Sequence, residues 1–312
     1  MIELTKLEAF LYAAENLSFS EAARLLRLTQ PSVSHRIKAL EQDLGVDLFD
    51  RSGHPLQLTE AGRLLLPWAH KLIRQAHATE AMMASLQHAV VGELRVACST
   101  TAGKYILPQL AARFRQRNPG IQVRILACTP QHVIPRLLEG EANLAVVSSY
   151  DLCGQGFECQ EFFRDRISLI VPAHHPWSFR EAVEPADLLP EPLLMREPSS
   201  GTRRVLMTEL ARHDITQDDL NIYLELGNAE AIVKTVEAGF GVAFVSSLAA
   251  SWALAQGRVT TVPVEGLELT RTVYMIRRSL EAPYRPQEVF WGFVHDPTNA
   301  DLLQMADSPR PF

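Results

Sequence analysis

The chain has 312 residues, of which 47% are hydrophobic and 21% charged, values typical of a globular protein with two or three domains. Its net charge of −6 argues against nucleic-acid binding over the whole surface, but it allows a small basic face on an acidic body. No uncharged apolar run approaches the length of about 18 residues that a membrane span needs. The acidic, amphipathic start MIELTKLEAF is unlike a secretion signal, so we expect a cytoplasmic protein.

The chain has four cysteines, and no two of them have C-x-x-C spacing. They are Cys98, Cys128, Cys153 and Cys159. In a cytoplasmic protein we expect reduced thiols in the core or in loops. A redox role for Cys153 and Cys159 is the alternative.

The first segment, residues 1–58, has the pattern of short helices followed by a hairpin. Ser18 and Glu21 have the spacing of a capping box at a helix start. Pro31 suits the first turn of the next helix, where its missing N–H is not needed. Two short helices joined by a short turn form a helix-turn-helix. Two extended runs around residues 52–55 then predict a hairpin or wing.

The second of these helices, residues 30–44, has one apolar face and one polar face. Between Ala22 and Leu40 the chain has basic residues and no acidic one. The basic residues are Arg24, Arg27, Arg36 and Lys38. This segregated charge suits a helix in a major groove, where Gln30 could pair with adenine and Arg36 with guanine or phosphate. The alternative is a helix-turn-helix that contacts only protein.

One long helix is expected over residues 59–89, with Thr59 as its N-cap. Its apolar positions alternate in steps of four and three, as in a coiled coil. They are Leu65, Ala69, Leu72, Ala76, Thr79, Met83 and Leu86. Pro67 should kink or break the helix. We expect this seam to form a dimer; the alternative is an amphipathic helix that packs on its own domain.

From Glu93 onward, strand-like runs alternate with helical stretches. The strand-like runs are ELRVACS, IQVRILAC, ANLAVVS, ISLIVP, PLLM, IYLEL, VAFVS and TRTVYMI. The helical stretches include residues 104–117, 131–139, 201–212 and 228–238. The alternation predicts a parallel α/β architecture. About 200 residues suffice for two subdomains, with chain crossings near 161–165 and 264–268.

Polar side chains follow several of these strands, where parallel sheets bind ligands. They lie in CSTTAGKY, VVSSYD, REPSSGTRR and LGNAEA. The third stretch opens a helix, whose backbone N–H groups favour an anion. Ser and Thr at helix starts usually act only as caps, and it is their recurrence at four junctions that favours a ligand site.

No enzyme motif is complete in this sequence. The stretch EAGFGVA lacks the third glycine of a dinucleotide fingerprint, and neither a G-x-S-x-G elbow nor a P-loop occurs. His174 and His175 could indicate a metal site, but no nearby cysteine or carboxylate cluster completes one. We therefore expect no catalytic residue, no metal and no cofactor.

Residues 1–65 resemble the DNA-binding domain of LysR-type transcriptional regulators. The resemblance runs from LEAFLYAAENLSFSEAARLLRLTQPSVSHRIKALEQDLGVDLFDR to LTEAG. It implies an α/β fold with an N-terminal winged helix-turn-helix, a long linker helix that dimerises, and a two-subdomain effector domain like a periplasmic binding protein. The expected domains are residues 1–58 for DNA binding, 59–89 for the linker, 90–300 for the effector and 301–312 as a flexible tail. Subdomain I would span about 93–162 and 266–298, and subdomain II about 163–265.

The resemblance also implies site residues. Those on the recognition helix would be Gln30, Pro31, Ser32, Ser34, His35, Arg36 and Lys38, with Arg51 in the wing. The first candidates at the effector site would be Thr100, Thr101, Ser149, Thr202 and Asn228. The second candidates would be Ser99, Ser200, Gly201 and Arg203. The stretch EPSSGTR is most similar to the branch that controls carbon fixation and sulfur or nitrogen assimilation, which implies a small anionic effector; an aromatic acid is the alternative.

The function implied is a ligand-responsive transcriptional regulator that reads an inverted-repeat operator. Its expected partners are double-stranded DNA, a small-molecule effector, a second copy in a homodimer, four copies in a homotetramer, and RNA polymerase. A cytoplasmic sensor or enzyme that docks protein through its helix-turn-helix is the alternative.

Overall fold

The computed structural model describes residues 2–51, 56–85, 91–99, 101–148, 153–154, 156–279 and 284–306. The chain divides into two compact units. The first consists of residues 1–89 with 139–141, and the second of residues 90–138 and 142–312. None of the helices in the described ranges has both the length and the apolar composition to cross a membrane.

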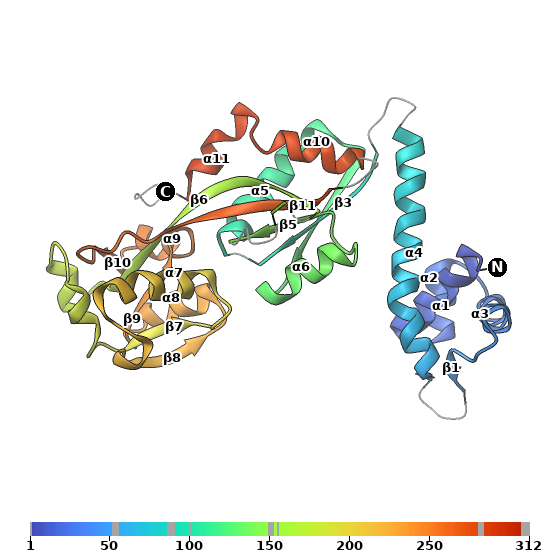
Figure 1. Ribbon diagram of the computed structural model, residues 1–312, viewed down its shortest axis with the longest axis horizontal. Coiled ribbons are helices and arrows are strands. Elements are labelled where there is room, and N and C mark those ends of the chain that lie inside the picture. The colour runs from blue at the N-terminus through green and yellow to red at the C-terminus, as the bar shows by residue number, and fades with distance from the viewer. Residues whose placement is uncertain are drawn as a thin grey trace. The chain divides into compact units, whose positions relative to one another are not determined.

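The first unit is a winged helix-turn-helix followed by a long helix (Figure 1). Its elements are α1 (Leu4–Asn16), α2 (Phe19–Leu26), α3 (Gln30–Leu44), β1 (Phe49–Asp50), β2 (Gln57–Leu58) and α4 (Glu60–Ser85). Leu7, Phe10, Ile37 and Leu40 are fully buried where these helices meet. β1 pairs antiparallel with β2, which confirms the predicted hairpin, and the tip at 52–55 lies outside the described residues.

The expected helix starts are present. Ser18 Oγ accepts a hydrogen bond from the Glu21 N–H at 3.2 Å, and Thr59 Oγ1 accepts one from the Gly62 N–H at 3.0 Å. The Glu21 carboxylate turns to Arg24, at 3.0 Å, and does not complete the reciprocal half of the capping box. These caps satisfy N–H groups that a helix start leaves without a partner.

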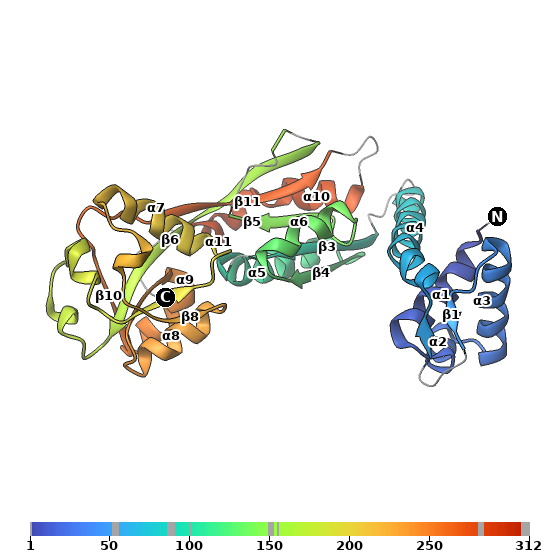
Figure 2. The same cartoon turned by 60° about the horizontal axis from the view of Figure 1, so that its bottom comes forward.

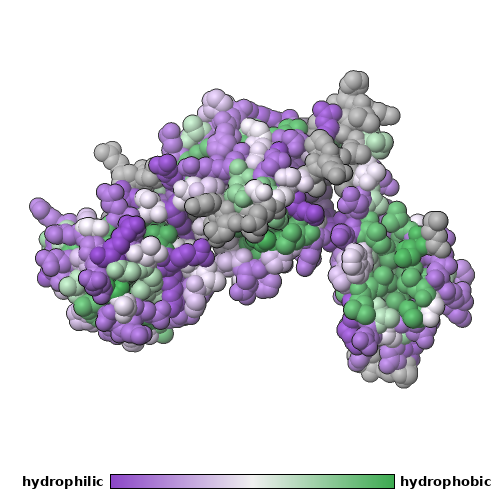
Figure 3. Space-filling model, in the orientation of Figure 1, coloured by the Kyte–Doolittle hydropathy of each residue, from purple (hydrophilic) through white to green (hydrophobic). Residues whose placement is uncertain are grey.

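Helix α4 continues through Pro67 without the break that was one expectation. The predicted seam was partly wrong. Ala69 is buried in the unit's own core, together with Ile73. Of the predicted seam residues, Met83 is 52% exposed. Leu72, also a predicted seam residue, is 43% exposed, and it lies on one stripe with Leu64 at 67% and Trp68 at 60% exposure, which the prediction did not include. We call these three residues the α4 apolar face; Figure 3 shows apolar side chains gathered on the face of this unit along which α4 runs.

The second unit is built on a nine-stranded sheet. Its strands are β3 (Gly92–Cys98), β4 (Ile121–Ala127), β5 (Leu144–Val147), β6 (Phe157–Pro172), β7 (Leu193–Arg196), β8 (Ile222–Leu226), β9 (Val242–Ser246), β10 (Val259–Val262) and β11 (Thr270–Arg278). The order is β4-β3-β5-β11-β6-β9-β7-β8, with β10 beside β6. The expectation of a parallel sheet was confirmed only in part: β3 pairs parallel with β4 and β5, and β7 with β8 and β9. The sheet is mixed, because β6, β10 and β11 pair antiparallel with their neighbours.

Two strands join the two halves of this sheet. The first part of β6, up to Arg166, pairs with β11, and the part from Ile167 pairs with β9 and β10. β11 lies beside the first part of β6 (Figure 1 and Figure 2), and β6 alone continues as a strand into the other half. One half packs around Phe114, Phe162 and Phe290. The other half has cores on both faces of its sheet.

Helices cover these strands. They are α5 (Thr101–Arg117), α6 (Pro130–Leu138), α7 (Gly201–Leu210), α8 (Ala229–Glu237), α9 (Ser247–Ala255), α10 (Arg285–Phe293) and α11 (Ala300–Gln304). Short 3-10 turns lie at Pro176–Phe179, Pro185–Leu188, Ala211–His213, Gln217–Asp219 and Pro297–Asn299. The flexible tail predicted from residue 301 was wrong for residues 301–306, because α11 packs with Leu302 2% exposed and Ala306 fully buried. Residues 307–312 lie outside the described part.

The cysteine expectation was wrong for one pair. Cys153 and Cys159 form a disulfide, with Cα atoms 5.7 Å apart. Cys98 is buried and Cys128 is half-buried, and neither is disulfide-bonded. The spacing of six residues carries no recognised motif, so the sequence offered no signal for the bond beyond the alternative redox role.

Candidate DNA-binding and effector sites

The polar face of α3 is presented to solvent. Gln30, Pro31, His35 and Lys38 are exposed, while Val33, Ile37 and Leu40 on the opposite face are fully buried. Ser32, Ser34 and Arg36 are half-buried at the boundary. A rigid helix anchored by its apolar face, with polar and basic groups outward, has the layout needed to reach base edges and phosphates.

Arg51 lies at the base of the wing and is held by an acid that the sequence reasoning missed. Its Nη2 lies 2.7 Å from Glu41 Oε2, and its guanidinium stacks 5.6 Å from the Phe19 ring centroid. Glu41 is 7% exposed, and its other oxygen accepts the N–H groups of Leu48 and Phe49. Glu41 thus fixes the path of the chain into the wing, although a glutamate in an amphipathic helix pattern normally indicates a solvent-facing position.

In the second unit, β5, α7 and β11 converge at Gly201. A Cβ added to Gly201 would lie 2.2 Å from Ser148 Oγ and 3.1 Å from Arg271 Nη1. The backbone at the start of α7 therefore approaches both side chains closely, which only glycine allows without a shift. We call Ser148, Ser200, Gly201, Thr202 and Arg271 the strand-end cluster.

Arg271 is oriented by a buried acid on the neighbouring strand. Its Nε donates to Asp165 Oδ2 at 2.8 Å, and Ser246 Oγ donates to Asp165 Oδ1 at 2.6 Å. Asp165 is fully buried and Arg271 is 7% exposed. Nη2 lies 2.7 Å from the same carboxylate oxygen but is not aligned for a hydrogen bond. Burial raises the pKa of Asp165, while Arg271 and Ser246 act to lower it.

The start of α7 carries unused hydrogen-bonding capacity. Ser200 and Thr202 are each 2% exposed. Ser200 Oγ has no hydrogen-bond partner within the described ranges. A buried polar atom without a partner calls for a ligand or water. The hydroxyl, the first N–H groups of α7 and the Arg271 guanidinium together form a set of donors suited to an oxyanion.

The other predicted effector residues have different surroundings. The Arg203 guanidinium donates to Arg196 O at 2.7 Å and Gln217 Oε1 at 2.9 Å and pairs with Glu225, so we give it a positioning role. Asn228 caps α8 by accepting the Ala231 N–H at 3.0 Å. Ser99 is half-buried beyond β3. Thr100, Ser149 and the side chain of Thr101 lie outside what the structure describes.

His175 has a structural environment. Its Nε2 lies 3.0 Å from Glu191 Oε1, and its Nδ1 accepts the Trp177 N–H at 3.2 Å. Both ring nitrogens are therefore engaged within the protein. In the described part of the chain, no three His, Cys, Asp or Glu side chains are grouped as metal ligands.

A winged helix-turn-helix, a long helix and an α/β unit with ligand-binding capacity define a DNA-binding transcriptional regulator with a sensory domain. Residues 4–63 match the family described as "Bacterial regulatory helix-turn-helix protein, lysR family", and residues 87–297 match the "LysR substrate binding domain". The chain belongs to the LysR family and is a ligand-responsive transcriptional regulator. This family consists of regulators, not enzymes.

Individual relatives extend over most of the chain. A "Probable RuBisCO transcriptional regulator" of Trichormus variabilis is 32% identical over 92% of this chain and 88% of its own length. The structure of full-length CbnR complexed with its target DNA has 24% sequence identity and a TM-score of 0.69 to this chain. The match covers 96% of this chain and all of CbnR, and it shows that the two proteins share a fold. The regulatory domain of Synechocystis CcmR in complex with 2-PG is 25% identical, with TM-score 0.59 over 65% of this chain and 95% of that domain.

Proposed function

We propose that this regulator reads an inverted-repeat operator through α3 and responds to a small anion held by the strand-end cluster. The observation that carries the anion proposal is the buried, unpartnered Ser200 Oγ beside the α7 N-terminus and Arg271. The 2-PG complex of CcmR supports the same class of ligand. The proposed DNA-contacting residues are those predicted from the sequence: Gln30, Pro31, Ser32, Ser34, His35, Arg36, Lys38 and Arg51.

The DNA proposal is tested by selecting bound sequences from a random duplex pool with the full chain at stated salt. An enriched inverted repeat supports a two-fold dimer that presents two α3 helices to two half-sites. Failure to enrich any sequence, with and without 2-PG and other small anions, would favour a protein-docking role for the outward face of α3.

Replacing Arg36 or Lys38 with alanine should weaken binding to the selected operator. If either group contacts a phosphate, the slope of log affinity against log salt should fall by about 0.9. If either contacts a base, discrimination at that position should fall by about 1–3 kcal/mol. Fluorescence anisotropy over a salt series distinguishes the two. Lys6→Ala is the control, because Lys6 lies on α1 and bonds to Asp43 at 2.9 Å. Unchanged affinity in both α3 variants would contradict the assignment of α3.

We also propose that the α4 apolar face forms the dimer. Trp68 is 60% exposed, with Lys71 Nζ 5.1 Å from its ring centroid, and it lies between Leu64 and Leu72 on one stripe of the helix. Such a stripe on a surface helix marks an interaction site, and a second copy offers the matching apolar surface.

Trp68→Lys should therefore raise the dimer dissociation constant by about thirtyfold or more, since a central interface tryptophan typically contributes about 2 kcal/mol or more. Light scattering over a concentration series measures this. Leu25→Lys, at a side chain 42% exposed on α2, should leave the dimer intact. A Trp68→Lys protein that dimerises like the wild type would refute this interface.

The wider assembly follows from these proposals. A dimer that binds DNA through α3 can pair again through its second units into a homotetramer, and the effector would then change how the dimers hold and bend DNA. Regulation of transcription requires action on RNA polymerase at the promoter. We place the protein in the cytoplasm because its operator lies on cytoplasmic DNA.

A further inference from the structure

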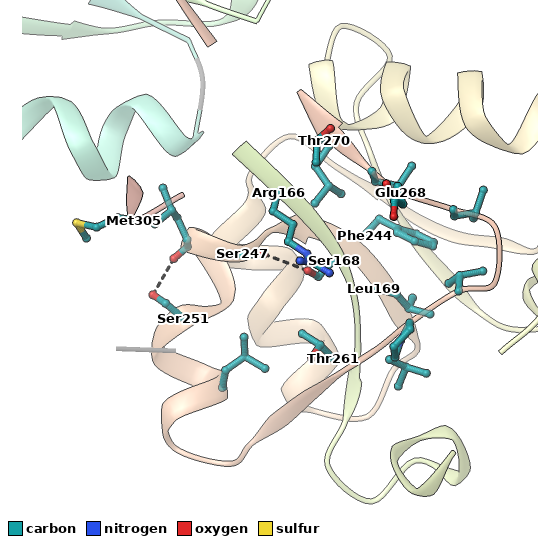
Figure 4. A pocket seen from close by; sticks show the side chains of 18 residues that line it. Arg166, Ser168, Leu169, Phe244, Ser247, Ser251, Thr261, Glu268, Thr270 and Met305 are labelled. Atoms are coloured by element: carbon teal, nitrogen blue, oxygen red, sulfur yellow. Dashed lines mark hydrogen bonds between the residues drawn. The ribbon is translucent and has the colours of Figure 1, made fainter. Parts of the chain in front are cut away.

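A cavity in the second unit lies along β6 and is lined by residues from both faces of that strand, from Arg166 to Leu169. It has a volume of about 270 Å³ and lies between α9 and the strands β6 and β10. We call this cavity the α9 groove, and seven of its lining residues are polar: Arg166, Ser168, Ser247, Ser251, Thr261, Glu268 and Thr270. Figure 4 shows Arg166 and Ser168 on β6, with the hydrogen bond between Ser168 and Ser247.

The groove combines hydroxyl groups with the apolar side chains that normally fill the space between a helix and a sheet. Ser247 and Ser251 are one turn apart on α9 and half-buried, and Ser251 Oγ donates to Leu248 O at 2.8 Å. Ser168 Oγ lies 3.0 Å from Ser247 Oγ, and this contact leaves hydroxyl lone pairs and donor positions unused. The groove therefore has unused hydrogen-bonding capacity.

Arg166 provides the charge. Its side chain is exposed, and no hydrogen bond or ion pair to its guanidinium occurs within the residues that the structure describes. Every other lining group near it is a hydroxyl or an apolar side chain, except Glu268, which lies beside Phe244 on the other side of the cavity (Figure 4). A guanidinium with adjacent hydroxyls binds carboxylates and phosphates through charge-assisted hydrogen bonds.

The groove also borders both halves of the unit. Successive side chains of a strand point to opposite faces, so Asp165 faces Arg271 in the strand-end region while Arg166 faces the groove. Arg166 pairs in register with Thr270, and its N–H donates to Ala306 O beyond α11. Leu254 and Met305 supply apolar walls. Pockets where two halves of a domain meet are preferred ligand sites.

We propose that the α9 groove is a second ligand site, which takes a small organic oxyanion with a compact apolar part, such as a phosphate ester or a carboxylate. The oxyanion is held by Arg166, Ser168 and Ser247, and the apolar part lies against Leu254 and Met305. The site is separate from the strand-end cluster and does not depend on that cluster binding the effector.

Calorimetric titration of the full chain with phenyl phosphate tests this site. To exclude binding at the strand-end cluster, the titration is repeated in a Gly201→Ala background. Arg166→Gln should weaken binding by about tenfold or more in both backgrounds. Arg164→Gln, at an exposed arginine two residues earlier on β6, removes the same charge outside the groove and should leave binding unchanged. Because the Arg166 side chain is exposed, Arg166→Gln should fold like the wild type, and circular dichroism checks this.

Glu268→Gln tests the charge of the ligand. Removing this carboxylate should tighten phenyl phosphate binding if the groove selects anions, and weaker binding in this variant would overturn that class. Equal binding of phenyl phosphate by wild type and Arg166→Gln, or equal weakening by Arg164→Gln, would overturn the site itself. If the Gly201→Ala variant, with Arg166 intact, binds no phenyl phosphate, the ligand belongs to the strand-end cluster. That result would also overturn the α9 groove as a ligand site.

Discussion

Replacing Arg271 with methionine is expected to destabilise the second unit by about 3–5 kcal/mol, the usual cost of leaving a buried charge without its partner. Asp165 is fully buried, and Arg271 is the cation that it contacts, at 2.8 Å. Ser246 would remain as a neutral donor at 2.6 Å, which cannot replace a charge. The pair also joins β6 to β11, the strands that connect both halves of the sheet, so the loss should extend across the unit.

The loss of stability in the Arg271→Met variant should become smaller as the pH falls. Burial already raises the pKa of Asp165 above its ordinary 3.8, and Arg271 opposes that rise. A carboxyl whose pKa is higher in the folded than in the unfolded state binds more protons when folded, so stability decreases as the pH rises through that interval. Removing Arg271 raises the pKa of Asp165 further and extends the interval upward. The difference between variant and wild type should therefore be smaller at about pH 5 than at about pH 8.

Hydrogen exchange at the amides of β6 and β11, corrected for intrinsic rates, measures this stability in the full chain. Arg164→Met is the matched control, because Arg164 lies on β6 with a side chain 67% exposed. The double variant Asp165→Asn/Arg271→Met should recover much of the loss, because it removes both charges. Normal protection in Arg271→Met, or a loss that does not vary with pH, would show that the pair contributes little.

The sequence was informative wherever structure is local. The N-caps at Ser18 and Thr59 follow from hydrogen bonds between residues a few positions apart. The strand β9 follows from its short, continuous apolar run, which is buried throughout. The first part of β6, FECQEFFRDR, was missed because its charged residues obscure the strand pattern. That segment is a strand because β11, more than 100 residues later in the chain, pairs with it.

The candidate sites show the same division. Gly201 and Thr202 could be placed at a helix start from EPSSGTR, and the structure has α7 begin there. Asp165 and Arg271 could not be recognised, because their charges became a buried pair only through the register of two distant strands. Arg203 is a residue type that often binds anions, yet its guanidinium donates hydrogen bonds to Arg196 O and Gln217 Oε1 within the protein. Sequence indicates which groups can bind an anion, but tertiary contacts decide which of them are free to do so.

Substituting Gly201 with alanine is expected to weaken anion binding at the strand-end cluster by roughly tenfold to a hundredfold. The new Cβ would lie 2.2 Å from Ser148 Oγ and 3.1 Å from Arg271 Nη1, so these groups must move. The loss of one hydrogen bond to a charged group costs about 1.5–3 kcal/mol, and each 1.4 kcal/mol is about a tenfold change in affinity. Calorimetric titration with 2-PG, inorganic phosphate and sulfate measures the change.

Two variants distinguish a lost ligand contact from a general fault in folding. Gly292→Ala places the same methyl group on α10, where an added Cβ meets nothing within 4 Å, and it should bind anions like the wild type. Ser148→Ala/Gly201→Ala removes the colliding hydroxyl, so it should recover the stability of the unit without recovering anion affinity, because the Cβ still lies against Arg271. If the double variant binds as tightly as the wild type, Ser148 and the close approach of the backbone at Gly201 do not form the effector site. If no anion of the series binds the wild type, the cluster takes a different class of ligand.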